Sequence, residues 1–388
     1  FRPLSRKLLD RPQVLARIRG LIPDPDRAHL VPFMTTWDDR ELAMRLGIPM
    51  YGADPAHANL GTKSEGRRLF AEAGVRHPRG TEGLHTRAEV VAALRDLRQE
   101  VPGLRRAIVK HNEGVSGFGN AIVDLSSLGD EPTDEDFDAL IDTLPTDGHV
   151  GGVDGYLATL EREGGIVEEM IDAVRVVSPS VQLRITPLGE VELLSTHDQI
   201  LGGDSGQVFM GSRFPADAAY AEQISASARL VGERLAARGV IGRFAIDYIV
   251  VERDDGGWDD YAIEVNLRKG GTTHPFLTLQ FLTDGTYDED RAVFVAPDGT
   301  EKHYVAADHM RVDGLERLTP PDLLEAALIE GVHFDQTTLT GTVFHMLSAM
   351  PTHGYVGVTC VGNSPADAQE RYDEICRFLA ALTASLDD

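Results

Sequence analysis

The fold of this chain is decided by two apolar stretches, FAIDYIVV at residues 244–251 and YAIEVNLRKGGTTH at residues 261–274. The Asp-Asp-Gly-Gly sequence between them is typical of a turn, so the two stretches predict a β-hairpin. Because residues two apart on a strand share a face, Glu264 and Asn266 point the same way, and Asp247 on the partner strand can join them. Two carboxylates and an amide oxygen suit Mg²⁺, which prefers oxygen ligands. The hairpin therefore predicts a metal site.

The alternative interpretation is that these polar residues are solvated side chains on the hairpin surface. Apolar neighbours such as Ile246 and Val265 indicate instead that the hairpin is well buried, and a buried carboxylate needs a cation or strong donors. Arg268 follows as a candidate donor to a carboxylate or to a transferring phosphoryl group. The backbone amides of Gly270 and Gly271 are candidates to approach a developing oxyanion.

A glycine-rich segment, HNEGVSGFGN at residues 111–120, joins predicted strands at 107–110 and 121–125. Its glycine order fits neither a dinucleotide fingerprint nor a Walker A loop. A glycine-rich hairpin tip exposes amide groups that can lie over phosphates, although such tips also occur as plain surface hairpins. Lys110 ends the first strand and Lys63 opens a predicted helix, so both are candidates to hold phosphate, with solvated lysines as the alternative.

Residues 168–171, Glu-Glu-Met-Ile, end a further predicted strand. The main chain of such a segment can hydrogen-bond a purine edge while a nearby carboxylate takes ribose hydroxyls. The alternative is a pair of exposed glutamates. The histidines and cysteines show no zinc spacing, the serines form no nucleophile elbow, and His345 is interpreted as a core histidine within an apolar strand.

Composition narrows the class of protein. The 388 residues, 42% of them hydrophobic, are enough for two or three packed domains. No apolar run reaches the roughly 20 residues that span a bilayer, no secretory signal is visible, and there are two cysteines, which together predict a cytoplasmic protein. The net charge of −25 argues against nucleic acid and membrane partners and favours the approach of an amine, although acidity also simply aids solubility.

Periodicity and capping signals predict the remaining elements. Thr86 and Glu89 form a capping box, and Ser364 with Pro365 begins the last helix. Residues 126–164 are acidic and are expected to be partly mobile surface. The other predicted elements are short strands at 30–36 and 47–52, helices at 38–46, 63–73, 218–238 and 320–330, and strands at 180–186, 190–196, 340–347 and 354–361.

Taken together, these residues resemble the ATP-grasp ligases over roughly residues 60–290. The resemblance implies that Lys63 and Lys110 contact the nucleotide phosphates beneath a glycine-rich lid, and that a hinge contacts adenine. It also makes Asp247, Glu264 and Asn266 the Mg²⁺ ligands and Arg268 the catalytic arginine, together with Lys110. The implied lid residues are Ser116, Gly117, Phe118 and Gly119, and the implied hinge residues are Glu168, Glu169, Met170 and Ile171.

A closer resemblance is to the peptide ligases of the pheganomycin type, through LGIPMYGADP at 46–55, SPSVQLR at 178–184 and GYVGVTCVG at 354–362. It implies an α/β (α+β) chain with an ATP-grasp fold. The expected domains are a partial pre-ATP-grasp domain at residues 1–61, an ATP-grasp core at 62–300 whose lid subdomain spans about 105–170, and a small C-terminal α/β domain at 301–388.

The resemblance implies an ADP-forming ligase in peptide natural-product (antibiotic) biosynthesis. ATP would phosphorylate the carboxylate of a small acid or amino acid, and an amine or peptide acceptor would displace phosphate to form an amide. The implied cofactors are ATP and Mg²⁺, with Mn²⁺ as a substitute, and a homodimer is common among such ligases. Two alternatives stay open: a kinase acting on a hydroxyl of a small molecule, and a nucleotide-binding regulator without turnover.

One position departs from the family pattern. The stretch from Glu264 to His274 is similar to that of D-alanine–D-alanine ligases, but the arginine expected two residues before the aspartate is Ala245 here. Arg243 or Arg184 is the candidate replacement. These two arginines and His274 are the candidate substrate contacts.

Overall fold

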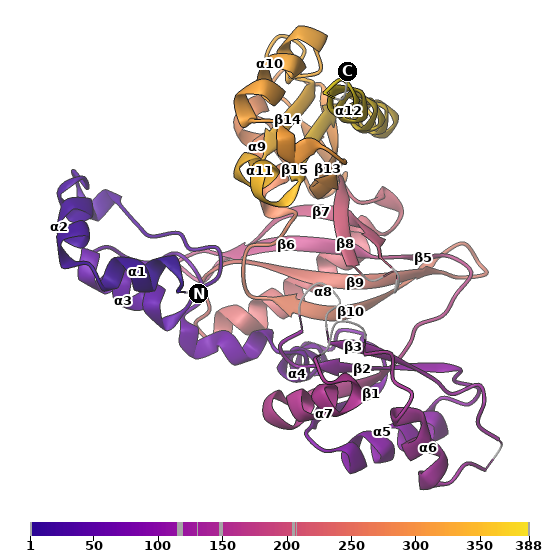
Figure 1. Cartoon of the computed structure of the whole chain (residues 1–388). Helices are drawn as coiled ribbons and strands as arrows, with labels where there is room; N and C mark the ends of the chain where they lie inside the picture. Colours follow the sequence, from indigo (N-terminus) through magenta and orange to yellow (C-terminus); the bar gives the residue numbers. More distant parts are fainter. Residues whose placement is uncertain are drawn as a thin grey trace.

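The computed structural model describes residues 2–114, 119–129, 131–146, 150–203, 206 and 208–386. Figure 1 shows a large central sheet with a smaller sheet below it, an N-terminal helical segment to one side and a C-terminal unit above. The two sheets matter most for function, because the candidate site lies between them.

The central sheet is antiparallel throughout, and in the described residues it has the strand path β10-β9-β6-β7-β8-β13-β12-β11. One face packs on α4 (Lys63–Ala73) and α8 (Ala218–Ala237), where alternate residues of β9 such as Phe244 and Ile246 enter the main core. The opposite face is left for the site. The strands of the central sheet from β5 to β13 are β5 (Val176–Val177), β6 (Pro179–Ile185), β7 (Val191–Gly202), β8 (Val208–Phe214), β9 (Gly242–Glu252), β10 (Trp258–Asn266), β11 (Thr286–Asp288), β12 (Val293–Val295) and β13 (Glu301–Arg311).

The smaller sheet has the order β1-β4-β2-β3 and contains the glycine-rich hairpin. Its strands are β1 (Gly80–Leu84), β2 (Arg106–His111), β3 (Asn120–Asp124) and β4 (Gly165–Glu169), covered by α5 (Arg87–Glu100), α6 (Asp134–Ile141) and α7 (Gly152–Glu163). The described part of the segment 126–164, predicted to be partly mobile surface, contains the helices α6 and α7, and its mobility stays a prediction. Phe137 of α6 and Tyr156 of α7 are fully buried in the core of this unit, which overrides the acidic composition.

The N-terminal segment is helical, with α1 (Leu4–Leu9), α2 (Pro12–Gly20), η1 (Pro25–Arg27), α3 (Trp37–Leu46) and η2 (Pro55–Gly61). The predicted helix at 38–46 is confirmed. The strands predicted at 30–36 and 47–52 are reduced to one isolated parallel bridge between Leu30 and Met50. Pro32 and Pro49 lack the N–H groups that a longer ladder would need.

The C-terminal unit is joined to the central sheet, because β13 pairs with β8 through Tyr304 and Phe214. Its further elements are α9 (Thr273–Thr283), η3 (Leu315–Arg317), α10 (Pro320–Glu330), β14 (Gly341–His345), η4 (Leu347–Ala349), α11 (Met350–His353), β15 (Tyr355–Gly362) and α12 (Pro365–Ala384). The predicted Ser364 N-cap of the last helix is confirmed, as is the capping box of α5. No helix in the described ranges combines the length and apolarity required to cross a bilayer.

Candidate active site

A cleft of about 330 Å³ opens between the two sheets. The smaller sheet contributes residues of β2, β3 and β4, and the central sheet contributes residues of β6 to β10. One part of the cleft is apolar, and the other carries charge. The apolar wall is formed by Ile108, Met170, Ile171, Leu201, Phe209, Ile249 and Ile263.

The predicted metal ligands meet on the cleft face of the β9–β10 hairpin. A bulge between Ala262 and Glu264 brings Glu264 directly opposite Asp247. The Asn266 amide nitrogen donates to Asp247 Oδ2 at 2.9 Å. The three side chains are therefore neighbours, and their assignment as Mg²⁺ ligands stays a prediction.

Asp247 forms no ion pair within the described part of the chain, although the charge of Arg268 acts on it. Burial, followed by the nearby charge of Glu264, raises its pKa to about 6. Its oxygens accept hydrogen bonds from the amides of Gln199 and Asn266, each at 2.9 Å. A divalent ion fits this donor set in place of the amide donors, with the Asn266 amide turned so that its oxygen faces the ion. Among the described residues no group of three or more His, Cys, Asp or Glu side chains offers another metal site.

Lys63 connects three parts of the site. Its side chain is buried at the start of α4, and Nζ lies 3.3 Å from Glu264 Oε1 and 2.9 Å from the carbonyl oxygen of Gly114 in the glycine-rich segment. The next residue strengthens the same junction, because the Ser64 hydroxyl donates to Asn112 Oδ1 at 2.7 Å. Lys63 thus stands between the predicted metal ligands and the predicted phosphate lid.

Lys110 belongs to a buried charge cluster. Its ammonium is hydrogen-bonded to Glu168, whose other oxygen lies 3.2 Å from Arg67. Arg67 also approaches Glu82 at 3.3 Å and donates to the Pro78 carbonyl at 2.8 Å. Glu168 therefore holds Lys110 and Arg67 with its side chain, and its contact with the nucleotide stays a prediction.

The predicted hinge continues from Glu169 along the edge of the cleft. The Glu169 carboxylate accepts the backbone N–H of Arg79 at 2.8 Å, and the N–H of Met170 donates to the carbonyl of Arg106 at 3.1 Å. Met170 and Ile171 line the apolar wall. The segment is thus anchored on both sides, and its contact with adenine stays a prediction.

The glycine-rich hairpin is confirmed as a connection between β2 and β3, with Lys110 opposite Asn120. The predicted lid residues Ser116, Gly117 and Phe118 lie outside the described residues. Gly119 has φ +88°, and a Cβ there would lie 3.1 Å from His111 Nδ1. The Tyr156 hydroxyl lies 3.0 Å from the carbonyl oxygens of both Val109 and Gly119, which fixes the base of the hairpin.

The segment after β10 also reaches the cleft. Arg268 lines it and donates to the Lys269 carbonyl at 3.0 Å. The N–H of Gly270 donates to the Thr273 hydroxyl at 3.0 Å, and its role as an oxyanion donor stays a prediction. A Cβ on Gly271 would lie 2.6 Å from the ring of Phe209, which explains the small residue there.

Two of the three candidate substrate residues lie side by side. Arg184 and Arg243 are opposite each other on β6 and β9, and Arg184 is paired with Glu192. His274 lies at the start of α9 with its ring 4.5 Å from that of His345. His345 approaches Asp308 at 3.3 Å but has no hydrogen bond at its buried Nδ1, so it is not the fully satisfied core histidine that was expected.

Sequence reasoning missed several residues of the site. Ser180 and Gln199 line the cleft from β6 and β7, and Arg67 and Tyr156 support it from behind. Each is an ordinary residue within a helix or strand, so no local motif marks it. Arg67 carries the one available signal, because a cation four residues after Lys63 would lie on the same face of α4.

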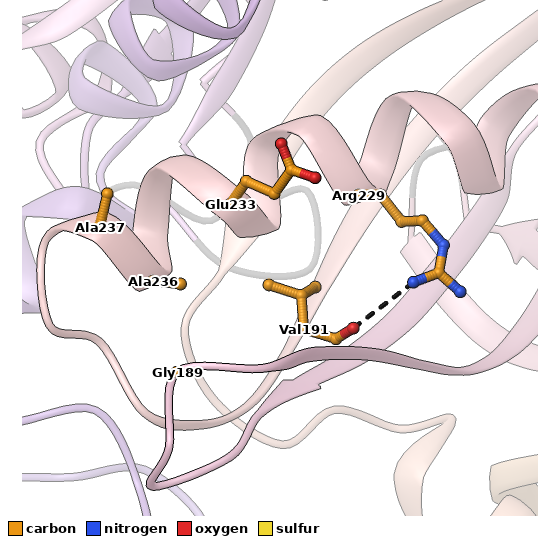
Figure 2. A pocket seen from close by; sticks show the side chains of 6 residues that line it. All are labelled: Gly189, Val191, Arg229, Glu233, Ala236 and Ala237. Atoms are coloured by element: carbon orange, nitrogen blue, oxygen red, sulfur yellow. Dashed lines mark hydrogen bonds between the residues drawn. The ribbon is translucent and has the colours of Figure 1, made fainter.

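A second hollow lies between α8 and the turn before β7 (Figure 2). Arg229 spans it with a hydrogen bond to the Val191 carbonyl at 3.4 Å. Glu233, Ala236, Ala237 and Gly189 complete its lining. None of the predicted site residues lies there, and its one guanidinium is already paired with Glu289, so the cleft between the sheets remains the candidate active site.

Comparison with known families agrees with this geometry. A model of the family described as IQCH-like, ATP-grasp matches residues 55–136 and 153–290, and a model described as the PGM1 C-terminal domain matches residues 322–375. The first match contains the strands of the smaller sheet and the strands of the central sheet from β5 to β11.

Two curated proteins are similar in sequence. L-propargylglycine–L-glutamate ligase of Streptantibioticus cattleyicolor is 30% identical over 382 residues, which cover 97% of this chain and 76% of that protein. IQ motif-containing protein H of Danio rerio is 25% identical over 377 residues, covering 88% of this chain and 35% of that protein.

Solved structures share the fold. The ADP complex of N5-carboxyaminoimidazole ribonucleotide synthetase superposes with a TM-score of 0.57 at 13% identity, covering 96% of this chain and 84% of that one. Biotin carboxylase from Campylobacter jejuni superposes with a TM-score of 0.58 at 14% identity, covering 93% and 76%. At these identities the likeness concerns the fold alone.

Proposed function

We propose that this chain, which belongs to the ATP-grasp family, is an ATP-dependent carboxylate–amine ligase that joins an amino acid to an amine through an acyl phosphate. The observation that carries the proposal is the single cleft that gathers an apolar wall, two buried lysines and a carboxylate–amide trio. These are the groups that an adenine ring, a triphosphate and a divalent ion require. The relative named for joining L-propargylglycine to L-glutamate supports amino-acid substrates.

Each group then has a defined task. The apolar wall would take adenine, while Lys63 and Lys110 would contact phosphate oxygens in place of some of their present carboxylate partners. Asp247, Glu264 and Asn266 would hold Mg²⁺, or Mn²⁺ as a substitute, which when bound neutralises charge on the phosphates. Arg268 would contact the transferring phosphoryl group. Orientation and charge stabilisation carry this reaction, so no nucleophilic side chain is needed.

Product analysis tests the proposal directly. The purified chain is incubated with ATP, Mg²⁺ and a pool that contains all proteinogenic amino acids, L-propargylglycine and short peptides, and the products are identified by mass spectrometry. A ligase gives ADP together with a mass equal to two substrates minus water. ADP formation without any condensed product would contradict the proposal.

Hydroxylamine separates the ligase from the kinase alternative. An activated carboxylate reacts with hydroxylamine to give a hydroxamate, whereas phosphate transfer to a hydroxyl gives none. We expect a hydroxamate that depends on ATP and on the acid substrate. A phosphorylated small molecule without hydroxamate would favour the kinase, and absence of ADP formation with every substrate would favour the regulator.

A further inference from the structure

The cleft face of β9 changes its chemistry along the strand. Residues two apart share a face, so Ile249, Asp247, Ala245 and Arg243 follow one another on the side that faces the cleft. The face is apolar at Ile249, acidic at Asp247 and cationic at Arg243. At roughly 3.3 Å per residue, the backbone of Arg243 lies about 13 Å from that of Asp247. Arg243 is not among the residues that line the cleft, and it continues the same strand face beyond the predicted metal ligands.

Arg243 and Lys269 lack anionic partners. The Nη1 atom of Arg243 is buried and has no hydrogen bond, and in the described part of the chain no carboxylate lies within ion-pair distance of either side chain. Burial lowers the pKa of Arg243, and burial together with the charge of Arg243 lowers the pKa of Lys269. Two cations held close together without a counter-charge are costly. Their isolation is notable in a chain of net charge −25, where carboxylates are abundant.

The surrounding residues do not neutralise this pair. Arg184 faces Arg243 from β6, and Glu192 is already paired with Arg184. Tyr51 of the N-terminal segment lies close enough to Arg184 and Arg243 to interact with both charges, and burial raises the pKa of its phenol, so the hydroxyl keeps its proton as a donor.

The N-terminal segment closes this end of the site. The backbone N–H of Lys269 donates to the carbonyl of Phe33 at 3.1 Å. A Cβ on Gly242 would lie 2.6 Å from the Cα of Gly52, so the backbone beside Tyr51 packs directly on the strand that carries Arg243. The cluster thus combines residues of two separate parts of the chain around donors that have no acceptor.

We infer that Arg243 and Lys269, with the hydroxyl of Tyr51, bind a free carboxylate of an amino-acid substrate, the carboxylate that does not react. The inference rests on the proposed ligase function. A guanidinium and an ammonium together give a carboxylate charge-assisted hydrogen bonds. Under the proposed function the nucleotide phosphates would be contacted by Lys63 and Lys110, which are paired with Glu264 and Glu168. The carboxylate belongs either to a dicarboxylic acid substrate or to an acceptor amino acid.

Arg243→Met tests the inference, with Arg291→Met as the matched control, because Arg291 is exposed, is paired with Glu301 and does not line the cleft. The substrates are the acid and the amine that product analysis identifies, each also supplied as the primary amide of its non-reacting carboxylate. In Arg243→Met we expect KM for one of the two to rise roughly tenfold to a hundredfold, with KM for ATP unchanged. Which KM rises tells whether the carboxylate belongs to the acid or to the acceptor.

The amide substrates provide a double-mutant cycle. In the wild-type enzyme, replacing that substrate by its primary amide should raise KM by a similar factor. In Arg243→Met the same replacement should raise KM little further. Unchanged KM values, or an equal loss from the amide in both enzymes, would overturn the inference while leaving the ligase intact. A wild-type enzyme that forms no amide with any pair would instead overturn the proposed function. Lys269→Gln repeats the cycle if Arg243→Met does not fold.

Discussion

Individual charged side chains of the candidate site form ion pairs with one another. Lys63 contacts Glu264, and Glu168 lies between Lys110 and Arg67. Both lysines are buried, so each needs a counter-charge while no phosphate is bound. The carboxylates hold the lysines in place, and under the proposed function Glu264 would also hold the ion while Glu168 would release Lys110 to the nucleotide.

Glu264→Gln removes the charge at the centre of this arrangement. Because a neutral amide binds a divalent ion weakly and no longer pairs with Lys63, we expect ADP formation to fall at least about a hundredfold, by the loss of metal charge stabilisation. Circular dichroism should show an unchanged fold. The control is Glu252→Gln, at the end of the same hairpin and paired only with Arg175 at the surface. Wild-type turnover in Glu264→Gln would remove the metal assignment.

Glu168→Gln tests the second arrangement by stability. The substitution leaves Lys110 and Arg67, both less than 8% exposed, without their shared anion. Loss of one partner of a buried ion pair costs about 3 kcal/mol. Urea unfolding at neutral pH measures the effect, with the exposed Glu325→Gln of α10 as control. A loss equal to that of the control would show that the cluster contributes nothing to the fold.

One buried carboxyl group connects two secondary-structure elements, a strand of the central sheet and the helix that packs on it. Asp198 of β7 accepts the Tyr220 hydroxyl at 2.8 Å and the Asp217 N–H at 3.2 Å, which ties β7 to the start of α8. Burial raises the pKa of Asp198 from 3.8 to about 6. The folded state therefore holds a proton that the unfolded state has released between these two pH values.

The pH dependence of stability follows from that difference. A raised carboxyl pKa contributes stability that is complete below pH 3.8 and is lost as pH rises to about 6. We expect the contribution of Asp198 to decline by about 2–3 kcal/mol over this window. Asp198→Asn should remove it, so the free energies of unfolding of wild type and variant, measured in urea from pH 4 to 7, should converge or cross. The exposed Asp290→Asn is the control. Parallel curves for wild type and Asp198→Asn would contradict the assignment.

Tyr156 connects α7 to the β2–β3 hairpin, which carries the predicted lid. Tyr156→Phe keeps the buried ring but removes the hydrogen bonds to the carbonyls of Val109 and Gly119. We expect a loss of about 1–2 kcal/mol of stability and a higher KM for ATP, because the base of the lid loses its support. Tyr355→Phe, on β15 of the C-terminal unit, should leave KM for ATP unchanged. Equal KM values for ATP in the wild type, Tyr156→Phe and Tyr355→Phe would show that Tyr156 does not support ATP binding.

Some elements of the fold could be predicted from the sequence, and others could not. The β9–β10 hairpin, α4 and α12 were predictable because apolar periodicity, a terminal glycine or a capping residue marks each of them locally. The acidic segment around α6 was not predictable, because Phe137 is buried only in the core that α6 shares with α5 and β3. The same holds for the site. Asp247 and Glu264 stand out as charges within apolar strands, whereas Gln199 acquires its role only when β7 is placed two strands from β9.

The central sheet runs through the whole molecule and connects the parts that the sequence suggests are separate. The N-terminal segment reaches the site at Phe33 and Tyr51, and the C-terminal unit continues the sheet beyond β8. The domain limits at residues 61 and 300 stay predictions, as does a homodimer. What the structure adds is that the limit at 300 falls immediately before β13, a strand that pairs on both sides with β8 and β15.

Truncation after residue 300 tests whether the sheet can end at β8. Removal of β13 would leave β8 as an open edge and would uncover the aromatic cluster in which Phe214, Phe276 and Phe294 pack on Tyr304. We therefore expect residues 1–300 to aggregate or to unfold without cooperativity, measured by size-exclusion chromatography with light scattering and by thermal unfolding. The matched control removes only residues 387–388 and should behave as the full chain. A monomeric, cooperatively unfolding 1–300 fragment that still binds ATP would show that the ATP-grasp core is an independent unit, and that the shared sheet is a docking contact between two domains.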